Sequence, residues 1–520
     1  MKHIRFAFLL VVTFVFTAVT TTAQISSKEV DKLVKHAMEE FNVAGVSVAI
    51  VKDGKIIHEK GYGVKSVEAK GKVDEHTQFL IASNSKAFTS AALAILVDDG
   101  LLSWTDKVVD IIPEFTMYNP YVTANFNIED LLSHRSGLGI GAGDLMWFPD
   151  GNNFTMDDIL SCYQYFEPKY SFRTTFAYNN LLFMIAGEVV ERVSGKTWEE
   201  FITEEIFIPL NMDNSFSSIS EISDIHNLAA PHATIDNELV MLSHYDKLDV
   251  GSAAGIYSSV DDISKWMLVQ LNEGKYGDSL ENELFSASVQ REMWKIHTTF
   301  NSRRSTRYNS NFAGYGLGWG LSDINGNMNV SHTGGMPGML SKTVLVPDLG
   351  LGVVVLTNTT DGGAGVFSAV SNTIVESYMG IEDNDWVSKY GDYFKKREKR
   401  GDSTMNQAWE IVANANDDNI NINDYIGVYK DNWFGKTEVY LDEDQLYFKS
   451  YRSPKLTGRM YYYNATTYVI KWNYNDMNAD AFAIFSLDED GKAQNIKLKG
   501  ISPNIDFSFD FQDLDLQRVK

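Results

Sequence analysis

Ser83 and Lys86 place a hydroxyl and an amine three residues apart. In a helix this spacing brings both side chains onto one face, where they can contact each other. A serine hydroxyl becomes a nucleophile when a base takes its proton, and a partly desolvated lysine can be that base. The apolar residues 87–96 predict a buried helix with Ser83 at its N-terminus, where the helix dipole favours negative charge. The alternative is a helix-capping serine followed by a solvated lysine.

Tyr178 and Asn180 precede a second apolar run, residues 181–193, which predicts another helix. In an extended segment two side chains at this spacing point the same way. The phenol could relay a proton if a nearby ammonium lowered its pKa, and the amide could hold a substrate amide and contact Lys86. The ordinary roles of such residues are a packing group and a helix cap.

The segment from Ser331 to Gly335 reads Ser-His-Thr-Gly-Gly. A strand that contains glycines lets a ligand backbone lie close against it. His332 would present a proton donor or a partial positive charge to such a ligand. The alternative is a loop histidine with a structural hydrogen bond only.

Taken together, S-x-x-K, Y-x-N and H-T-G in this order resemble the penicillin-recognising serine hydrolases. That family contains class C β-lactamases, D-alanyl-D-alanine carboxypeptidases, D-aminopeptidases and related esterases. The resemblance covers nearly all of residues 28–380. It includes residues 132–138, 209–212, 254–258 and 314–319 beside the three motifs.

The resemblance implies a peptidase S12-like serine hydrolase in which Ser83 attacks a carbonyl carbon and forms an acyl-enzyme. Lys86 and Tyr178 would share the proton transfers, and which of them is the formal base stays open. Backbone N–H groups of Ser83 and Gly335 would form an oxyanion hole. His332 would be a fourth catalytic residue. The implied substrate-binding residues are Asn180, Thr333, Gly334 and Gly335.

One residue departs from the class C β-lactamase pattern. Those enzymes usually carry lysine where His332 stands, whereas peptidase and esterase members often carry histidine. Because histidine is only partly charged at neutral pH, it would anchor a substrate carboxylate weakly. We therefore expect a peptide, amide or ester substrate, with a cell-wall peptide as one candidate. The alternatives are a β-lactamase and a covalent β-lactam or peptidoglycan sensor with little turnover.

Two predicted hairpins must position these motifs. Residues 45–62 predict one near the start of the chain, and residues 343–356 predict another far downstream. Strands at both ends with helices between them favour an α/β (α+β) fold, in which helices flank one antiparallel sheet. The resemblance adds an all-helical subregion. We assign residues 24–380 to this hydrolase domain.

The remaining sequence has a different texture. Residues 381–420 are charged and include a basic run at 395–400, which we interpret as a solvated linker helix because acidic residues surround it. Residues 421–520 alternate between apolar and polar side chains, with turns between the segments. This pattern predicts a small barrel or sandwich. It is similar to the lipocalin-like barrel that some bacterial family members carry.

The chain has 520 residues and a formal net charge of −24, which argues against binding to nucleic acid or anionic lipid. Residues 1–23 read as a signal peptide with cleavage after Ala23, so we expect a secreted or periplasmic protein without a membrane span. The single Cys162 excludes an intramolecular disulfide and is interpreted as a buried spacer. The histidines form no H-x-H or H-E-x-x-H pair, so no metal and no cofactor is predicted. The oligomeric state is not predicted.

Overall fold

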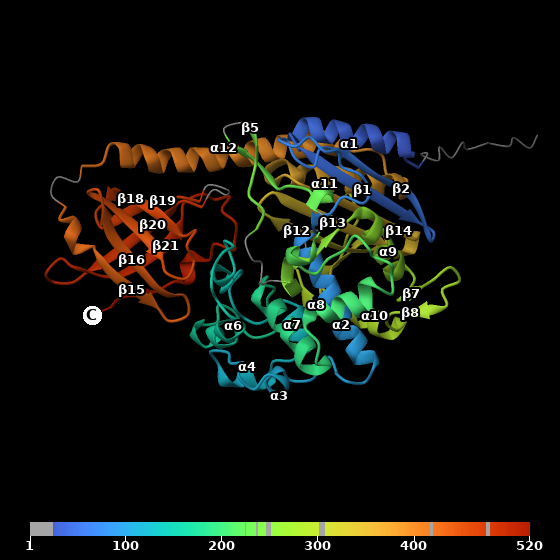
Figure 1. The fold of residues 1–520 in the computed structure, drawn as a ribbon, viewed down its shortest axis with the longest axis horizontal. Helices are drawn as coiled ribbons and strands as arrows, with labels where there is room; N and C mark the ends of the chain where they lie inside the picture. Colours follow the sequence, from blue (N-terminus) through green and yellow to red (C-terminus); the bar gives the residue numbers. More distant parts are fainter. Residues whose placement is uncertain are drawn as a thin grey trace, which may run out of the picture.

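The computed structural model describes residues 24–223, 225–235, 238–245, 251–300, 307–416, 420–474 and 479–519. The predicted signal peptide, residues 1–23, lies outside the described residues. Figure 1 shows a large mixed α/β domain beside a small β-barrel, with one long helix running along both. Within the described ranges, no helix is both long enough and apolar enough to cross a membrane.

An antiparallel sheet of eight strands, in the order β2-β1-β14-β13-β12-β11-β10-β9, forms the centre of the large domain. β1 pairs with β14, so the two predicted hairpins are neighbours in space. β14 is wholly buried and β1 nearly so, which explains why both read as continuous apolar runs. The strands are β1 (Gly45–Lys52), β2 (Lys55–Gly63), β9 (Thr298–Thr299), β10 (Ala313–Tyr315), β11 (Gly320–Ile324), β12 (Asn327–Met336), β13 (Met339–Val346) and β14 (Leu351–Thr357).

Helices cover both faces of this sheet. α1 (Ser27–Phe41) and α11 (Thr360–Tyr378) pack on one face with apolar side chains of β1, β13 and β14. α9 (Val260–Leu271) packs on the other face, on the side that also holds α2 (Ser85–Asp98) and α7 (Leu181–Ser194). This arrangement confirms the predicted antiparallel sheet flanked by helices.

Shorter elements complete the domain. Two-stranded pairs join β3 (Phe79–Leu80) to β6 (Tyr257–Ser258), β4 (His232–Ile235) to β5 (Glu238–Met241), and β7 (Lys275–Tyr276) to β8 (Asn282–Glu283). The remaining helices are α3 (Val108–Ile111), α4 (Pro120–Asn125), α5 (Ile128–Leu132), α6 (Met156–Cys162), α8 (Trp198–Ile202) and α10 (Ala287–Met293). Cys162 is buried at the end of α6, as the sequence predicted.

The C-terminal strands close into an eight-stranded barrel, which decides between the predicted barrel and sandwich. Buried residues alternate with partly exposed ones, most regularly in β17, because every second side chain faces the barrel interior. The resemblance of this part to lipocalins stays a prediction. The strands are β15 (Gly427–Asp431), β16 (Gly435–Asp442), β17 (Gln445–Ser450), β18 (Thr457–Asn464), β19 (Thr467–Trp472), β20 (Ala481–Leu487), β21 (Ala493–Gly500) and β22 (Leu516–Arg518).

The charged segment before the barrel forms one long helix, α12 (Trp386–Ala413), which lies along the top of both parts in Figure 1. Lys395 of α12 pairs with Glu40 of α1 at 2.7 Å. Arg397, two residues later, donates to the side chain of Asn504 beyond β21 at 3.2 Å. Residues only two positions apart on α12 therefore contact both α1 of the large domain and the barrel.

The barrel also packs directly against the large domain. Arg452 of the barrel forms an ion pair with Asp158 of α6 at 2.6 Å, and Lys455 pairs with Asp150 at 2.7 Å. Apolar contacts lie beside these pairs, since the rings of Phe166 and Trp433 are 4.9 Å apart. The barrel has its own strand topology, but its side chains belong to the same hydrophobic cluster as α2 and α7.

Candidate active site

Ser83 lies in a 3₁₀ turn, Ala82–Asn84, directly before α2. α2 begins two residues later, at Ser85, so Ser83 lies close to the N-terminal position that the sequence predicted. Ala82 has a φ of 47°, a left-handed conformation that costs energy for a residue with a Cβ. Hydrogen bonds on both sides hold the turn in place. The N–H of Ile81 donates to the carbonyl of Ile256 at 2.9 Å, and Asn84 Nδ2 donates to Ser341 Oγ at 2.7 Å.

Lys86 is wholly buried behind Ser83. Its Nζ lies 3.1 Å from Ser83 Oγ, 2.8 Å from Asn180 Oδ1 and 2.8 Å from the carbonyl oxygen of Ala253. Burial lowers the pKa of Lys86 to about 7, while the charge of Asp144 acts in the opposite direction. Near neutral pH a large fraction of the molecules therefore carries an uncharged amine beside the serine hydroxyl.

Tyr178 also forms a hydrogen bond with Ser83, and Lys86 Nζ is 5.0 Å from the centre of its ring. The condition under which this phenol could relay a proton, a pKa lowered by a nearby ammonium, is not met. Desolvation raises the pKa of Tyr178 well above its ordinary value, and the hydrogen bond with Ser83 lowers it by less. Tyr178 therefore keeps its proton at neutral pH, which suits a donor better than a base.

His332 on β12 is buried, and both ring nitrogens are engaged. Nδ1 lies 2.7 Å from the carbonyl oxygen of Thr333, which can only accept, so Nδ1 carries the hydrogen. Nε2 then accepts from the hydroxyl of Tyr315 at 2.7 Å. Burial and the nearby Lys86 lower the pKa of His332 to about 3. The expected partial positive charge is thus absent, and the imidazole serves as a neutral wall of the site.

The end of β12 runs past Ser83 with one open edge. Pairing with β11 stops at Ser331, so among the described strands only β13 pairs with residues 332–336. Gly334 is required here, because a Cβ at this position would lie 2.1 Å from the carbonyl oxygen of Ile81. The strand therefore lies directly against the turn that carries Ser83. Thr333, Gly334 and Gly335 line the same pocket as Ser83, and the oxyanion hole formed by Ser83 and Gly335 stays a prediction.

A pocket of about 490 Å³ opens in front of Ser83. Seven of the residues that line it are aromatic, and the barrel contributes Asp506, Phe507 and Ser508 from the segment between β21 and β22. The ring of Phe507 packs edge-on against Tyr178, with centroids 5.7 Å apart. The aromatic residues among those that line the pocket are Trp147, Phe176, Tyr178, Phe300, Tyr315, Phe367 and Phe507.

Three polar residues near the site, Asp144, Ser508 and His134, were not identified from the sequence. Asn180, which was predicted, donates from Nδ2 to Asp144 Oδ2 at 2.8 Å. Ser508 of the barrel donates to the same oxygen at 2.9 Å. His134 accepts from the N–H of Asn179 at 3.1 Å and lies against Tyr178, with ring centres 4.2 Å apart. No motif marks Asp144 or Ser508, whereas His134 belongs to one of the supporting segments.

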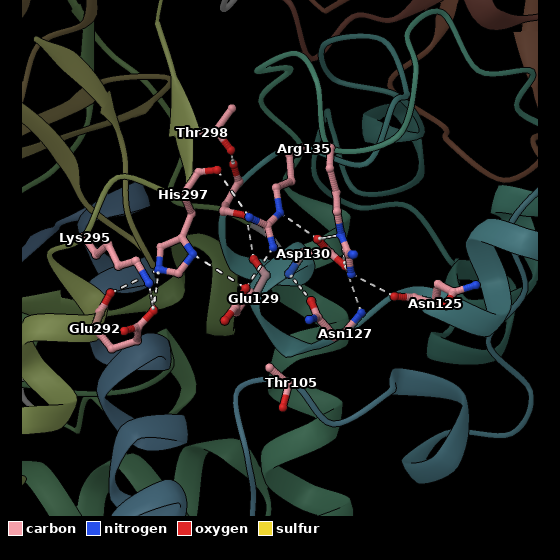
Figure 2. A network of polar contacts seen from close by, with 12 residues as sticks. Thr105, Asn125, Asn127, Glu129, Asp130, Arg135, Glu292, Lys295, His297 and Thr298 are labelled. Atoms are coloured by element: carbon pink, nitrogen blue, oxygen red, sulfur yellow. Dashed lines mark hydrogen bonds and ion pairs between the residues drawn. The ribbon is translucent and has the colours of Figure 1, made fainter.

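A second polar network could be mistaken for a metal site. Ligand atoms of Glu129, Glu292 and His297 lie within 4.8 Å of one another (Figure 2). Arg135 already pairs with Glu129 at 2.9 Å, and Lys295 pairs with Glu292 at 3.1 Å. Hydrogen bonds from His297 and Arg135 hold the pKa of Glu129 at about 2. Because side-chain cations balance these carboxylates, we interpret the network as a structural clamp. The absence of a metal stays a prediction.

Comparison with known proteins is consistent with this geometry. Residues 30–370 match the model of the Beta-lactamase family, and residues 414–518 match a domain of unknown function, DUF3471. The unguisins hydrolase ungD' of Aspergillus campestris is 26% identical over 428 residues, which cover 80% of this chain and 78% of that protein. Protein flp of Staphylococcus aureus is 26% identical over 64% of this chain and 63% of its own length.

Solved structures share the fold. The octameric penicillin-binding protein homologue from Pyrococcus abyssi aligns with a TM-score of 0.59 and 20% identity, over 95% of this chain and all of that chain. A penicillin-binding protein from Bacillus halodurans aligns with a TM-score of 0.54 and 24% identity, over 65% of this chain and 98% of that one. The family model spans well over half of the sequence and contains Ser83, Lys86, Tyr178 and His332. The chain belongs to the Beta-lactamase family.

Proposed function

We propose that this protein is a serine hydrolase that forms an acyl-enzyme on Ser83 with a peptide, amide or ester substrate. The contacts of Lys86 carry the proposal. Two of its three partners, Asn180 Oδ1 and the carbonyl oxygen of Ala253, can only accept hydrogen bonds. A neutral amine has two hydrogens and one lone pair. With both hydrogens given to these acceptors, the lone pair faces Ser83 Oγ at 3.1 Å and can accept its proton.

The reaction follows from these positions. As Ser83 Oγ forms a bond to the substrate carbonyl carbon, its proton moves to Lys86 Nζ, and the carbonyl oxygen becomes an oxyanion beside β12. When the C–N or C–O bond of the substrate breaks, the phenol of Tyr178 gives its proton to the leaving group, and Lys86 restores the proton of the phenol. Water then attacks the acyl carbon and Ser83 leaves, with the proton transfers reversed.

The pocket favours uncharged substrates. The described residues that line it include no lysine or arginine, and His332 is neutral. A substrate carboxylate would find no cationic partner there and would lie near the carboxyl group of Asp506. The aromatic wall suits apolar acyl groups, and the open edge of β12 suits an extended backbone. We therefore place neutral peptide amides and esters before β-lactams as substrates. The hydrolase name of the Aspergillus relative supports a hydrolytic reaction in general.

The test compares wild type with Ser83→Ala on D- and L-aminoacyl amides, chromogenic esters and nitrocefin. Repeated turnover by the wild type, and a loss of about 10³-fold or more in Ser83→Ala, support the proposal. Ser90→Ala is the matched control, because it removes a buried hydroxyl from the adjoining helix α2 at a residue that does not line the pocket. Mass spectrometry after acid quench should find the acyl group on Ser83. Full activity of Ser83→Ala would disprove the assignment, and a single acylation without turnover would indicate the covalent sensor instead.

Export is a second part of the proposal. The basic start and apolar run of residues 1–23 support a secreted or periplasmic location. The N-terminal sequence of protein recovered from the native host tests it: cleavage after Ala23 is expected, and a retained Met1 would contradict export through a cleavable signal.

A further inference from the structure

We propose that Ser508 of the barrel and Asp144 of the large domain are positioning residues that act through Asn180 on Lys86, so that the docked barrel controls how well Lys86 activates Ser83. We call these two residues and their hydrogen bond the Ser508–Asp144 link. The inference deepens the proposed function of the site and rests on it.

Asn180 connects Lys86 to the link. Its Oδ1 accepts from Lys86 Nζ at 2.8 Å, while its Nδ2 donates to Asp144 Oδ2 at 2.8 Å. A rotated amide would turn an N–H group toward Lys86 and an oxygen toward the carboxylate, and both contacts would be lost. Asp144 therefore fixes the amide in the orientation that takes one hydrogen from Lys86. Only in that orientation is the lone pair of the amine left for Ser83.

Ser508 provides a second hydrogen bond to the same carboxylate oxygen, at 2.9 Å. Its side chain is 3% exposed, so water cannot easily take its place. The N–H of Ser508 donates to Asp506 Oδ1 at 2.9 Å, which shapes the turn that presents the hydroxyl. Phe507, between them, contacts Tyr178. This segment of the barrel thus contacts Tyr178 directly and reaches Lys86 through Asp144 and Asn180.

Asp510 holds the backbone around Asp144. Its carboxylate accepts from the N–H of Gly143 at 2.7 Å and from the N–H of Leu145 at 3.1 Å, the residues on either side of Asp144. Asp144 and Asp510 are both wholly buried, which makes each of these hydrogen bonds costly to lose. The barrel therefore fixes both the main chain and the side chain of Asp144.

Ser508 and Asp144 together raise the pKa of Lys86. The charge of Asp144 raises the pKa of Lys86, and the hydrogen bond from Ser508 lowers the pKa of Asp144. Burial raises the pKa of Asp144 to about 7, so the two groups titrate in the same range and as a coupled pair. Removing the Ser508 hydroxyl makes the carboxylate less stable. Asp144 is then charged in fewer molecules, and the pKa of Lys86 falls.

Direct titration of Lys86 tests the link without any substrate. Full-length protein with ¹³C at lysine Cε is titrated by NMR, and Lys86→Met assigns the signal. We expect a midpoint lower by about half a pH unit in Ser508→Ala and by about one unit in Asp144→Asn. Ser508→Thr keeps the hydroxyl and should restore the wild-type midpoint. Ser502→Ala, which removes another buried barrel hydroxyl that accepts from the N–H of Asn504 at 3.1 Å, should leave it unchanged.

Labelling of Ser83 by a fluorophosphonate supplies the second readout. Above the midpoint, Ser508→Ala should slow labelling about fivefold, because Asn180 is held less firmly. An unchanged midpoint in folded Ser508→Ala and Asp144→Asn proteins refutes the link, and if Asp144→Asn does not fold, Ser508→Ala alone decides. Midpoints that shift as expected, in a wild type whose Ser83 is never labelled, would instead refute the proposed function and leave the coupling in place.

Discussion

The acylation rate should depend on pH through Lys86. With a pKa of about 7, about half of the molecules carry the amine at pH 7 and about 1% carry it at pH 5. The value of kcat/KM should therefore fall about 50-fold between these pH values, with a slope approaching tenfold per unit. A solvated lysine with the ordinary pKa of 10.5 would offer the amine in only about one molecule in 3,000 at pH 7. Burial of Lys86 thus supplies a factor of roughly 10³ in active base.

The assay is the initial rate of hydrolysis of a neutral chromogenic ester between pH 5 and 9, corrected for spontaneous hydrolysis. A neutral ester does not titrate, so the profile reports the protein alone. His332 should add no inflection in this range, because its pKa is about 3. Tyr178 should add none either, since its pKa is raised well above the ordinary value. Lys86→Arg is the matched control, because arginine is similar in length but stays protonated throughout.

Three results would refute this reasoning. A flat profile from pH 5 to 8 would show that no group with a pKa near 7 limits acylation. An acid limb that persists in Lys86→Arg, with activity within tenfold of wild type, would assign the limb to another residue. A midpoint above pH 9 would show that Lys86 is solvated during the reaction.

Two more predictions concern Phe507 and the stability of the fold. Phe507→Ala opens the pocket beside Tyr178 and should raise kcat/KM for long acyl esters about tenfold relative to acetyl esters. Phe507→Tyr keeps a ring of similar size and should not change this ratio. The same ratio in both variants would contradict a role of Phe507 in selecting substrate size. The free energy of unfolding of wild type minus that of Lys86→Met should rise by about 1.4 kcal/mol per pH unit between pH 7 and 10. This difference rises with pH because, between pH 7 and 10, Lys86 binds a proton in the unfolded chain that the buried amine has lost in the folded one. Urea denaturation at pH 7 and 9 measures it, and a constant difference would show that Lys86 is not neutral when folded.

Much of the fold could be predicted because the elements with the strongest local sequence patterns are also the most buried ones. β1 and β14 read as continuous apolar runs because they pair in the middle of a sheet covered on both faces. α2 is apolar on nearly every side because the domain surrounds it. Ser83 and Lys86 could be paired because their contact depends only on a spacing of three residues. Asn180 was found through its position in a motif.

The remaining features depend on tertiary burial, which no local pattern encodes. The hydrogen bond between Ser508 and Asp144 joins residues 364 positions apart, and neither belongs to a motif. The wrong expectations for His332 and Tyr178 have the same origin. The first took the ordinary pKa of histidine and the second relied on a nearby ammonium, whereas desolvation is the largest effect on the pKa of each group. The barrel was predicted as a separate domain whose role stayed open, because no local pattern shows which part of it contacts the pocket.

The barrel residues that line the pocket are synthesised long after Ser83. Ser83 lies early in the sequence, whereas Phe507 and Ser508 of the barrel lie shortly before the last strand, β22. A fragment cut within α12 would hold Ser83 and Lys86 but not Phe507 or Ser508, so the pocket would lose the part of its wall that the barrel supplies. Proteolysis between the two bodies would then widen the pocket and loosen the orientation of Asn180 without touching the nucleophile.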